Sequence, residues 1–124
     1  MTSGRSARAG AEEWQPVCRL EDLRVGQGAV ALVHGQSVAV FRTSREEVHA
    51  VGNHDPFLHT QSVSRGIVGA RDGVPFVGSA RHGHAFDLVT GRCLDDEHAA
   101  LPAYPVRIVD GRVLVGPRRV DLSA

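Results

Sequence analysis

Short apolar runs alternate with turn-forming residues along the chain from Trp14 to Gly116. Many of these runs are rich in β-branched side chains, which are common in strands, and glycine-containing pairs separate them. This pattern predicts closely spaced hairpins. The predicted strands are residues 14–18, 29–33, 38–41, 48–51, 66–70, 74–77, 85–88, 92–94, 106–109 and 113–115.

Turn residues between the apolar runs support the hairpin assignment. Asp110-Gly111 is typical of a type I′ turn, and the turn at 71–73 favours a positive φ at its glycine. Residues 34–37 separate two further apolar runs in the same way. No long apolar period of 3.6 residues is present, so only short helical turns are expected, at 20–23 and 95–100. We therefore predict an all-β sandwich or small barrel.

The two ends of the chain differ in composition from its middle. Residues 1–12 are small, polar and rich in Gly, Ala and Arg, which predicts a disordered tail. We expect a single domain over residues 13–117 and a second short tail over residues 118–124. No apolar run approaches the roughly 20 residues of a membrane span, and the first residues lack the apolar stretch of a secretory signal. The expected location is the cytoplasm.

Charge and cysteine content narrow the range of functions. The 124 residues are 42% hydrophobic and 23% charged, as in an ordinary globular domain. Fourteen basic residues balance fourteen acidic ones, so nothing favours binding to nucleic acid or to an anionic membrane. Cys18 and Cys93 lie far apart and form no Cys-x-x-Cys pair. We expect two reduced thiols and no disulfide framework.

Two stretches carry candidate chemistry. The first is Ala50–Phe57, with the sequence AVGNHDPF, and the second is Ser79–Leu88, with the sequence SARHGHAFDL, followed by Thr90-Gly91. The second resembles the cluster loop of Rieske ferredoxins, in which Cys-x-x-His-Gly precedes an aromatic residue, Asp-Leu and a Thr-Gly turn. The first stretch stands where that family has its Cys-x-His loop. The resemblance implies a Rieske-like β sandwich or barrel, with a small hairpin lobe formed by the two former cluster-binding loops.

The positions that match the Rieske ligands have lost most of their donors. A Rieske [2Fe–2S] centre needs two thiolates on one iron and two imidazoles on the other. The matching residues here are Asn53, Asp55, Ser79 and His82. Neutral amide and hydroxyl groups replace soft thiolates poorly, and one imidazole cannot hold two irons. We therefore expect no iron–sulfur cluster, no other metal and no cofactor in this chain.

The way in which the motifs depart from the Rieske pattern is itself characteristic. Asp55-Pro56-Phe57, the run Ser64–Gly69 and the run Gly91–Asp96 together resemble the small subunit of assimilatory NAD(P)H-dependent nitrite reductase. The resemblance implies a non-catalytic accessory subunit of an oxidoreductase complex. It also implies a large-subunit partner that carries FAD, an iron–sulfur cluster and sirohaem and reduces nitrite to ammonia. No catalytic residue is expected here, and the choice between NADH and NADPH lies in the partner.

Several loop residues are candidates for contact with a partner. They are His54, Pro56, Phe57, Arg65, Arg81 and His84. Phe57 has a second interpretation, in which it folds back onto the core that the cluster has vacated. We also expect Asp55 and His82 to exchange hydrogen bonds between the loops, with apolar packing from Pro56 and Phe57. Exposed apolar residues of the lobe could also support self-association.

Alternative chemistries remain open at the same loops. The histidines at 54, 59, 82 and 84 could bind a metal ion together with Asp55, since imidazole is a common metal ligand. A hydrolase triad of Ser79, His82 and Asp55 lacks the expected Gly-x-Ser-x-Gly turn. Two other functions are a cluster-free binding or regulatory module for another redox partner, and a ferredoxin-like electron carrier or metal protein with an atypical ligand set. Visible absorbance distinguishes the last of these.

Overall fold

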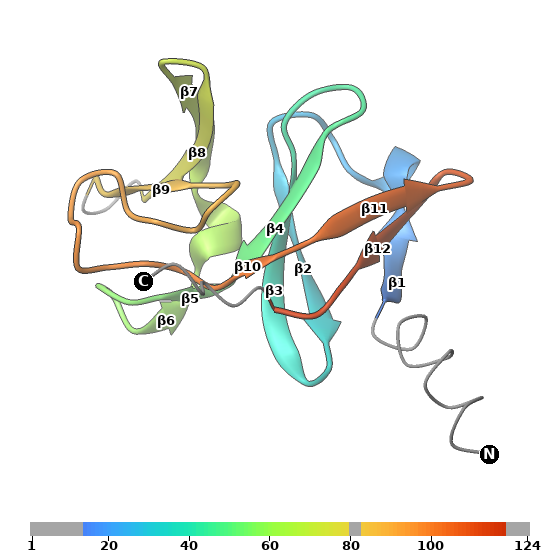
Figure 1. Ribbon diagram of the computed structural model, residues 1–124, viewed down its shortest axis with the longest axis horizontal. Helices are drawn as coiled ribbons and strands as arrows, with labels where there is room; N and C mark the ends of the chain where they lie inside the picture. The colour runs from blue at the N-terminus through green and yellow to red at the C-terminus, as the bar shows by residue number, and fades with distance from the viewer. Residues whose placement is uncertain (1–13, 80–82, 119–124) are drawn as a thin grey trace.

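The computed structural model describes residues 14–79 and 83–118, and its fold is all-β, as predicted (Figure 1). The only helical segments in these ranges are two 3₁₀ turns. The strands are β1 (Gln15–Arg19), β2 (Gly28–Val33), β3 (Gln36–Arg42), β4 (Val48–Gly52), β5 (His54–Asp55), β6 (Thr60–Gln61), β7 (Ile67–Arg71), β8 (Val74–Gly78), β9 (Ala85–Asp87), β10 (Ala103–Tyr104), β11 (Val106–Val109) and β12 (Arg112–Val115), and the 3₁₀ turns are η1 (Leu20–Asp22) and η2 (Val63–Arg65).

The strands form a base and a smaller lobe, which lie on the right and left of Figure 1. The base contains a sheet of order β1-β12-β11 and a sheet of order β10-β4-β3-β2. The lobe contains the β5-β6 hairpin and a sheet of order β7-β8-β9. The lobe is therefore built from the segments on either side of the two motif loops, as the resemblance implied.

Strand β3 is buried on both faces and joins the two halves of the molecule. Val38 and Val40 belong to the base core, whereas Ala39 and Phe41 belong to a second core that extends into the lobe. Successive side chains of a strand point to opposite faces, so one strand can serve both cores. All four of these side chains are at most 1% exposed. The lobe consequently shares its apolar packing with the base.

Tight turns close the hairpins of both halves. In three of them both central residues have positive φ, as a type I′ turn requires. The pairs are His34-Gly35 (49° and 80°), Asp72-Gly73 (52° and 81°) and Asp110-Gly111 (50° and 75°). The turns predicted at 71–73 and 110–111 are confirmed.

The segment after β9 differs from the prediction. Residues 92–94 form isolated bridges to Phe86 and Ala100 and no strand. Residues 95–100 form no helix, because the Asp96 carboxylate accepts the His98 N–H at 2.9 Å and its carbonyl accepts the Ala99 N–H at 3.1 Å. A side chain that caps its own turn in this way competes with helix formation.

Gly91 ends the turn that follows β9. The Asp87 carboxylate accepts the N–H groups of Val89 (2.7 Å) and Thr90 (3.2 Å), and the chain then passes through Gly91 with φ +84°. A Cβ atom at this position would overlap the carbonyl oxygen of Leu101. The Asp-Leu-x-Thr-Gly pattern therefore encodes a capped turn that lies against the neighbouring backbone.

Replacing Gly91 with alanine should destabilise the protein by at least about 3 kcal/mol, because left-handed strain adds to the overlap with Leu101. Gly26→Ala is the matched control, since Gly26 has φ +85° and no atom within 4 Å of its added Cβ. We expect a loss of about 1 kcal/mol there. Urea unfolding measures both values, and equal losses would contradict the close approach at Gly91.

Candidate functional site

Asn53 connects the first motif loop to the rest of the protein. Its side chain is buried (2% exposed), and Nδ2 donates to Ser37 Oγ at 3.1 Å and to the Gln61 carbonyl at 3.2 Å. Its Oδ1 accepts the Ser64 N–H at 2.8 Å. One amide thus bonds to β3, β6 and η2. The residue at this matched cluster position fixes the loop by hydrogen bonds.

Asp55 shapes the same loop from within. It is also 2% exposed, and its Oδ1 accepts the N–H groups of Phe57 (2.8 Å) and Leu58 (3.1 Å). The His59 N–H donates to the Asp55 carbonyl at 2.7 Å and closes the hairpin. A carboxylate that caps the next two amides is a common turn device for aspartate. The buried carboxyl group is therefore held by backbone donors.

The second motif loop is closed by its own backbone. The Ser79 N–H donates to the His84 carbonyl at 3.0 Å, and the Gly83 N–H donates to the Ser79 carbonyl at 3.0 Å. Arg81 and His82 lie outside the described residues. The expected hydrogen bonds between Asp55 and His82 therefore stay a prediction, as do the roles suggested for His82 in a metal site or a hydrolase triad.

A stacked pair of rings joins the two loops. The Phe57 and His84 ring centroids lie 3.9 Å apart with an interplanar angle of 16°. Phe57 also lies 6.1 Å from the Phe86 ring and packs against the second core. Such ring contacts contribute about 0.5–1.5 kcal/mol beyond their buried area. The structure therefore places Phe57 on the core and against the second loop.

Asp95 holds the second loop from its other side, a role that no motif in the sequence predicts. Its Oδ2 accepts the Ala85 N–H at 2.7 Å, and its Oδ1 accepts from Arg71 at 3.3 Å. The bond from the Ala85 N–H, followed by Arg71, holds the pKa of Asp95 below its ordinary value. The signal in the sequence that points to Asp95 is its place in the Gly91–Asp96 run, which carries part of the family resemblance.

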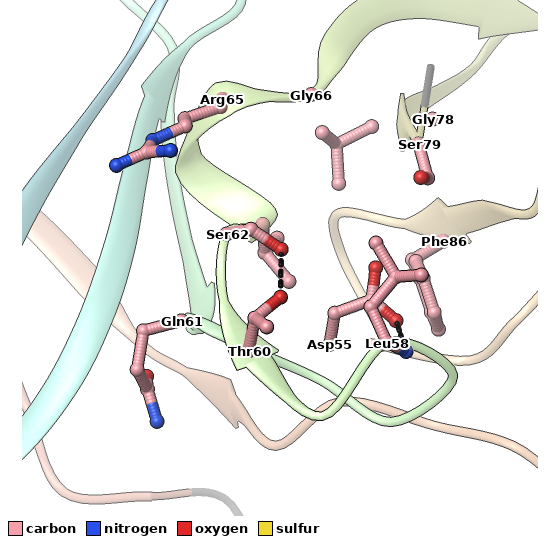
Figure 2. Close-up of a pocket in the computed structure, with 12 residues that line it drawn as sticks. Asp55, Leu58, Thr60, Gln61, Ser62, Arg65, Gly66, Gly78, Ser79 and Phe86 are labelled. Atoms are coloured by element: carbon pink, nitrogen blue, oxygen red, sulfur yellow. Dashed lines mark hydrogen bonds between the residues drawn. The ribbon is translucent and has the colours of Figure 1, made fainter. Parts of the chain in front are cut away.

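A cavity of about 760 Å³ lies between the loops (Figure 2). Val63, Val77 and Phe86 are its buried apolar residues, each at most 5% exposed. Thr60 and Ser62 place two hydroxyls 2.8 Å apart in its wall. The cavity brings together two of the matched cluster positions and one of the predicted contact residues, with the lining Asp55, Leu58, Thr60, Gln61, Ser62, Val63, Arg65, Gly66, Val77, Gly78, Ser79 and Phe86.

The donor groups around the loops do not fit a [2Fe–2S] cluster. The Asn53 amide is engaged by its three hydrogen bonds, and neither Asp55 nor Ser79 supplies a thiolate or an imidazole. Within residues 14–79 and 83–118, no group of three or more His, Cys, Asp or Glu side chains is arranged to hold a metal ion. His54 and His59 have ring centroids 6.1 Å apart on the first loop.

The two cysteines are free thiols that contact the apolar cores. Cys93 is buried in the second core, and Cys18 is partly buried against the base core. Burial, followed by the charge of Asp22, raises the pKa of the Cys18 thiol. A raised pKa lowers the thiolate fraction, which is the form that binds metals and attacks electrophiles.

No helix in the described part of the chain is long and apolar enough to cross a membrane.

The known proteins that are similar to this chain point consistently to one family. The model of the Rieske-like [2Fe-2S] domain family matches residues 13–116. The nitrite reductase (NADH) small subunit of Salmonella typhimurium is 35% identical over 102 residues, which cover 82% of this chain and 94% of that protein. A crystal structure from Mycobacterium tuberculosis, described as an NADH-dependent nitrite reductase small subunit, is 42% identical with a TM-score of 0.80, covering 88% of this chain and 96% of that one.

A third relative has a different organisation. The nitrite reductase [NAD(P)H] large subunit of Klebsiella oxytoca is 31% identical over 107 residues. The match covers 86% of this chain but only 11% of that protein. A segment similar to nearly all of the present chain is therefore covalently part of that large subunit.

Removal of the Asn53 amide should destabilise the protein strongly. Asn53→Ala loses three hydrogen bonds and leaves partners such as the Ser64 N–H unsatisfied, for which we expect a loss of about 2–4 kcal/mol. The adjacent exposed residue provides the control His54→Ala, expected to change stability by less than about 0.5 kcal/mol. Urea unfolding with fluorescence detection measures both, and similar values for the two variants would contradict the role of Asn53.

Asp95 should make stability depend on pH. Because its pKa is lower in the folded protein than in the unfolded chain, its contribution is present above about pH 4 and is lost as pH falls through the lowered value. Melting temperatures of the native protein and Asp95→Asn should therefore differ at pH 7 and converge at low pH. Arg71→Gln should retain most of the dependence, since the Ala85 N–H is the larger cause. A difference in melting temperature between the native protein and Asp95→Asn that persists at low pH would contradict this assignment.

Proposed function

The chain belongs to the Rieske-like [2Fe-2S] domain family and, within it, to the small subunits of NADH-dependent nitrite reductase, and we propose that it acts as the accessory subunit of an assimilatory nitrite reductase. The observation that carries the proposal is a match over 94% of the Salmonella typhimurium small subunit. Such coverage includes both motif loops and both halves of the fold. The alignment is therefore not confined to a shared core.

The Klebsiella oxytoca relative supports a large-subunit partner for this chain. There, a similar segment is joined covalently to a nitrite reductase large subunit. Fusion keeps a domain at high effective concentration next to the remainder of its chain. A separate small subunit must reach the same neighbour through a non-covalent interface. We infer that this chain binds a nitrite reductase large subunit by protein–protein contact.

The division of chemistry in the proposed complex follows from the donor groups. The large subunit would carry FAD, an iron–sulfur cluster and sirohaem, which transfer electrons from NADH or NADPH to nitrite. The loops of this chain hold the Asn53 amide and the Asp55 carboxylate in hydrogen bonds. The chain would accordingly contribute a binding surface and structural support and no catalytic residue. The proposed complex resides in the cytoplasm.

The proposal predicts a stable complex with the large subunit. When the full chain carries an affinity tag and is expressed together with the large subunit of its own organism, the two should elute together during size-exclusion chromatography. The tag alone, fused to an unrelated domain of similar size, serves as the control. Elution of the chain apart from the large subunit, with NADH-dependent nitrite reduction unchanged by its addition, would contradict the proposal. Binding to a different redox protein would instead support a regulatory module.

A further inference from the structure

The cavity between the two motif loops is preformed. Asn53 and Asp55 fix one wall through bonds to the backbone N–H groups of Ser64, Phe57 and Leu58. The backbone bond between Ser79 and His84 fixes the opposite wall. A volume of about 760 Å³ exceeds that of a single side chain and is within the range of specific ligand pockets. A partner segment that enters the cavity therefore meets walls that hydrogen bonds already hold in place.

Arg65 supplies an uncompensated positive charge at the edge of this cavity. It lies on η2 and is exposed, and its guanidinium forms no hydrogen bond or ion pair with the described residues, although its backbone N–H donates to the Ser62 carbonyl at 3.0 Å. The other charged residue among the described lining is Asp55, whose carboxylate is buried and capped by backbone N–H groups. Arg65 therefore supplies the exposed charge among the described residues that line the cavity. Figure 2 shows its guanidinium on the outer side of η2, turned away from Ser79 and Phe86.

Exposed aliphatic side chains on β2 lie on the same side of the molecule as η2. Val30 and Leu32 are 57% and 70% exposed. Val30 is paired with Ala39, which lies in the second core, and directly paired residues share one face of a sheet. Gly28, on the same face, lies so close to Ser64 that an added Cβ would overlap its carbonyl oxygen. The 3₁₀ turn η2 thus covers the start of β2 and leaves Val30 and Leu32 beside it.

Strand β2 also lacks the usual protection of a sheet edge. It stands at the end of the order β10-β4-β3-β2, and its six residues, GAVALV, contain no charge and no proline. Its register with β3 runs over all six residues without a bulge. Soluble proteins commonly guard such edges with lysine, proline or a bulge. An unguarded apolar edge beside a cavity is consistent with a surface that a partner covers.

We propose that Val30, Leu32, Arg65 and the cavity between the loops form the docking surface for the nitrite reductase large subunit. The occupant is a segment of that subunit with apolar side chains that enter the cavity and a neighbouring carboxylate that pairs with Arg65. Charge complementarity selects this occupant, because the exposed charge among the described lining residues is the Arg65 guanidinium, while Val63, Val77 and Phe86 give the wall an apolar part. The inference rests on the proposed function and adds the surface through which it is carried out.

The test compares charge reversal at two exposed arginines. Arg65→Glu should weaken binding of the full chain to the intact, cofactor-loaded large subunit by about tenfold or more, since it places like charges together at the interface. Arg112→Glu, on β12 of the base, is the matched control and should leave affinity unchanged. Leu32→Ser should also weaken binding. Isothermal titration calorimetry measures the affinities, and circular dichroism verifies that each variant is folded.

The possible outcomes separate the two proposals. If the native chain binds and only the Arg65 and Leu32 variants are impaired, the docking surface is supported. If the native chain and all three variants bind equally, this surface is wrong while the proposed function stands. If the native chain does not bind the large subunit at all, the proposed function fails and the docking surface fails with it. A concentration-dependent dimer that Arg65→Glu dissociates, without an effect on large-subunit binding, would assign the surface to a second copy of the chain.

Discussion

The lobe depends on one buried amide. Asn53 is the residue at which the first motif loop leaves β4, and its side chain reaches β3, β6 and η2 at once. A buried polar group costs free energy unless its bonds are made, so this position admits few other side chains. In a cluster-binding relative of this fold, metal bonds fix the corresponding loop. Here the same constraint is met by an amide, whose three bonds have directions as definite as those of a ligand.

The rest of the lobe follows from this anchor. With the first loop fixed, Asp55 can cap its own turn and Phe57 is carried onto the second core. The ring of His84 then stacks against Phe57, and Asp95 fixes the strand that follows His84 through the Ala85 N–H. Each contact is modest in free energy, and their effect is collective because they share the loops that they order. The shared core along β3 couples this arrangement to the base.

Much of the fold could be predicted from the sequence because its signals are local. Short, β-branched apolar runs and glycine-containing turns identified the hairpins around residues 34–35, 72–73 and 110–111. Strands β5, β6 and β10 have two residues each, too few to show a period, and β10 also depends on pairing with the distant strand β4. Residues 95–100 were misassigned because the side chain of Asp96 caps a turn there. The roles of Asn53 and Asp95 depend on partners far along the chain, which no local pattern reveals.

A Rieske fold without ligands retains the property that an electron carrier and an accessory subunit have in common, which is a pair of loops held in a defined relative position. A cluster provides that order through strong bonds and brings a redox function with it. Hydrogen bonds and ring stacking provide this order without a redox function. The volume between the loops then becomes available to side chains of another protein. Binding to a preordered surface avoids much of the entropy cost of ordering loops during association. Without the cluster, the loops therefore no longer hold a metal centre. Their role as a binding surface still requires a fixed relative position.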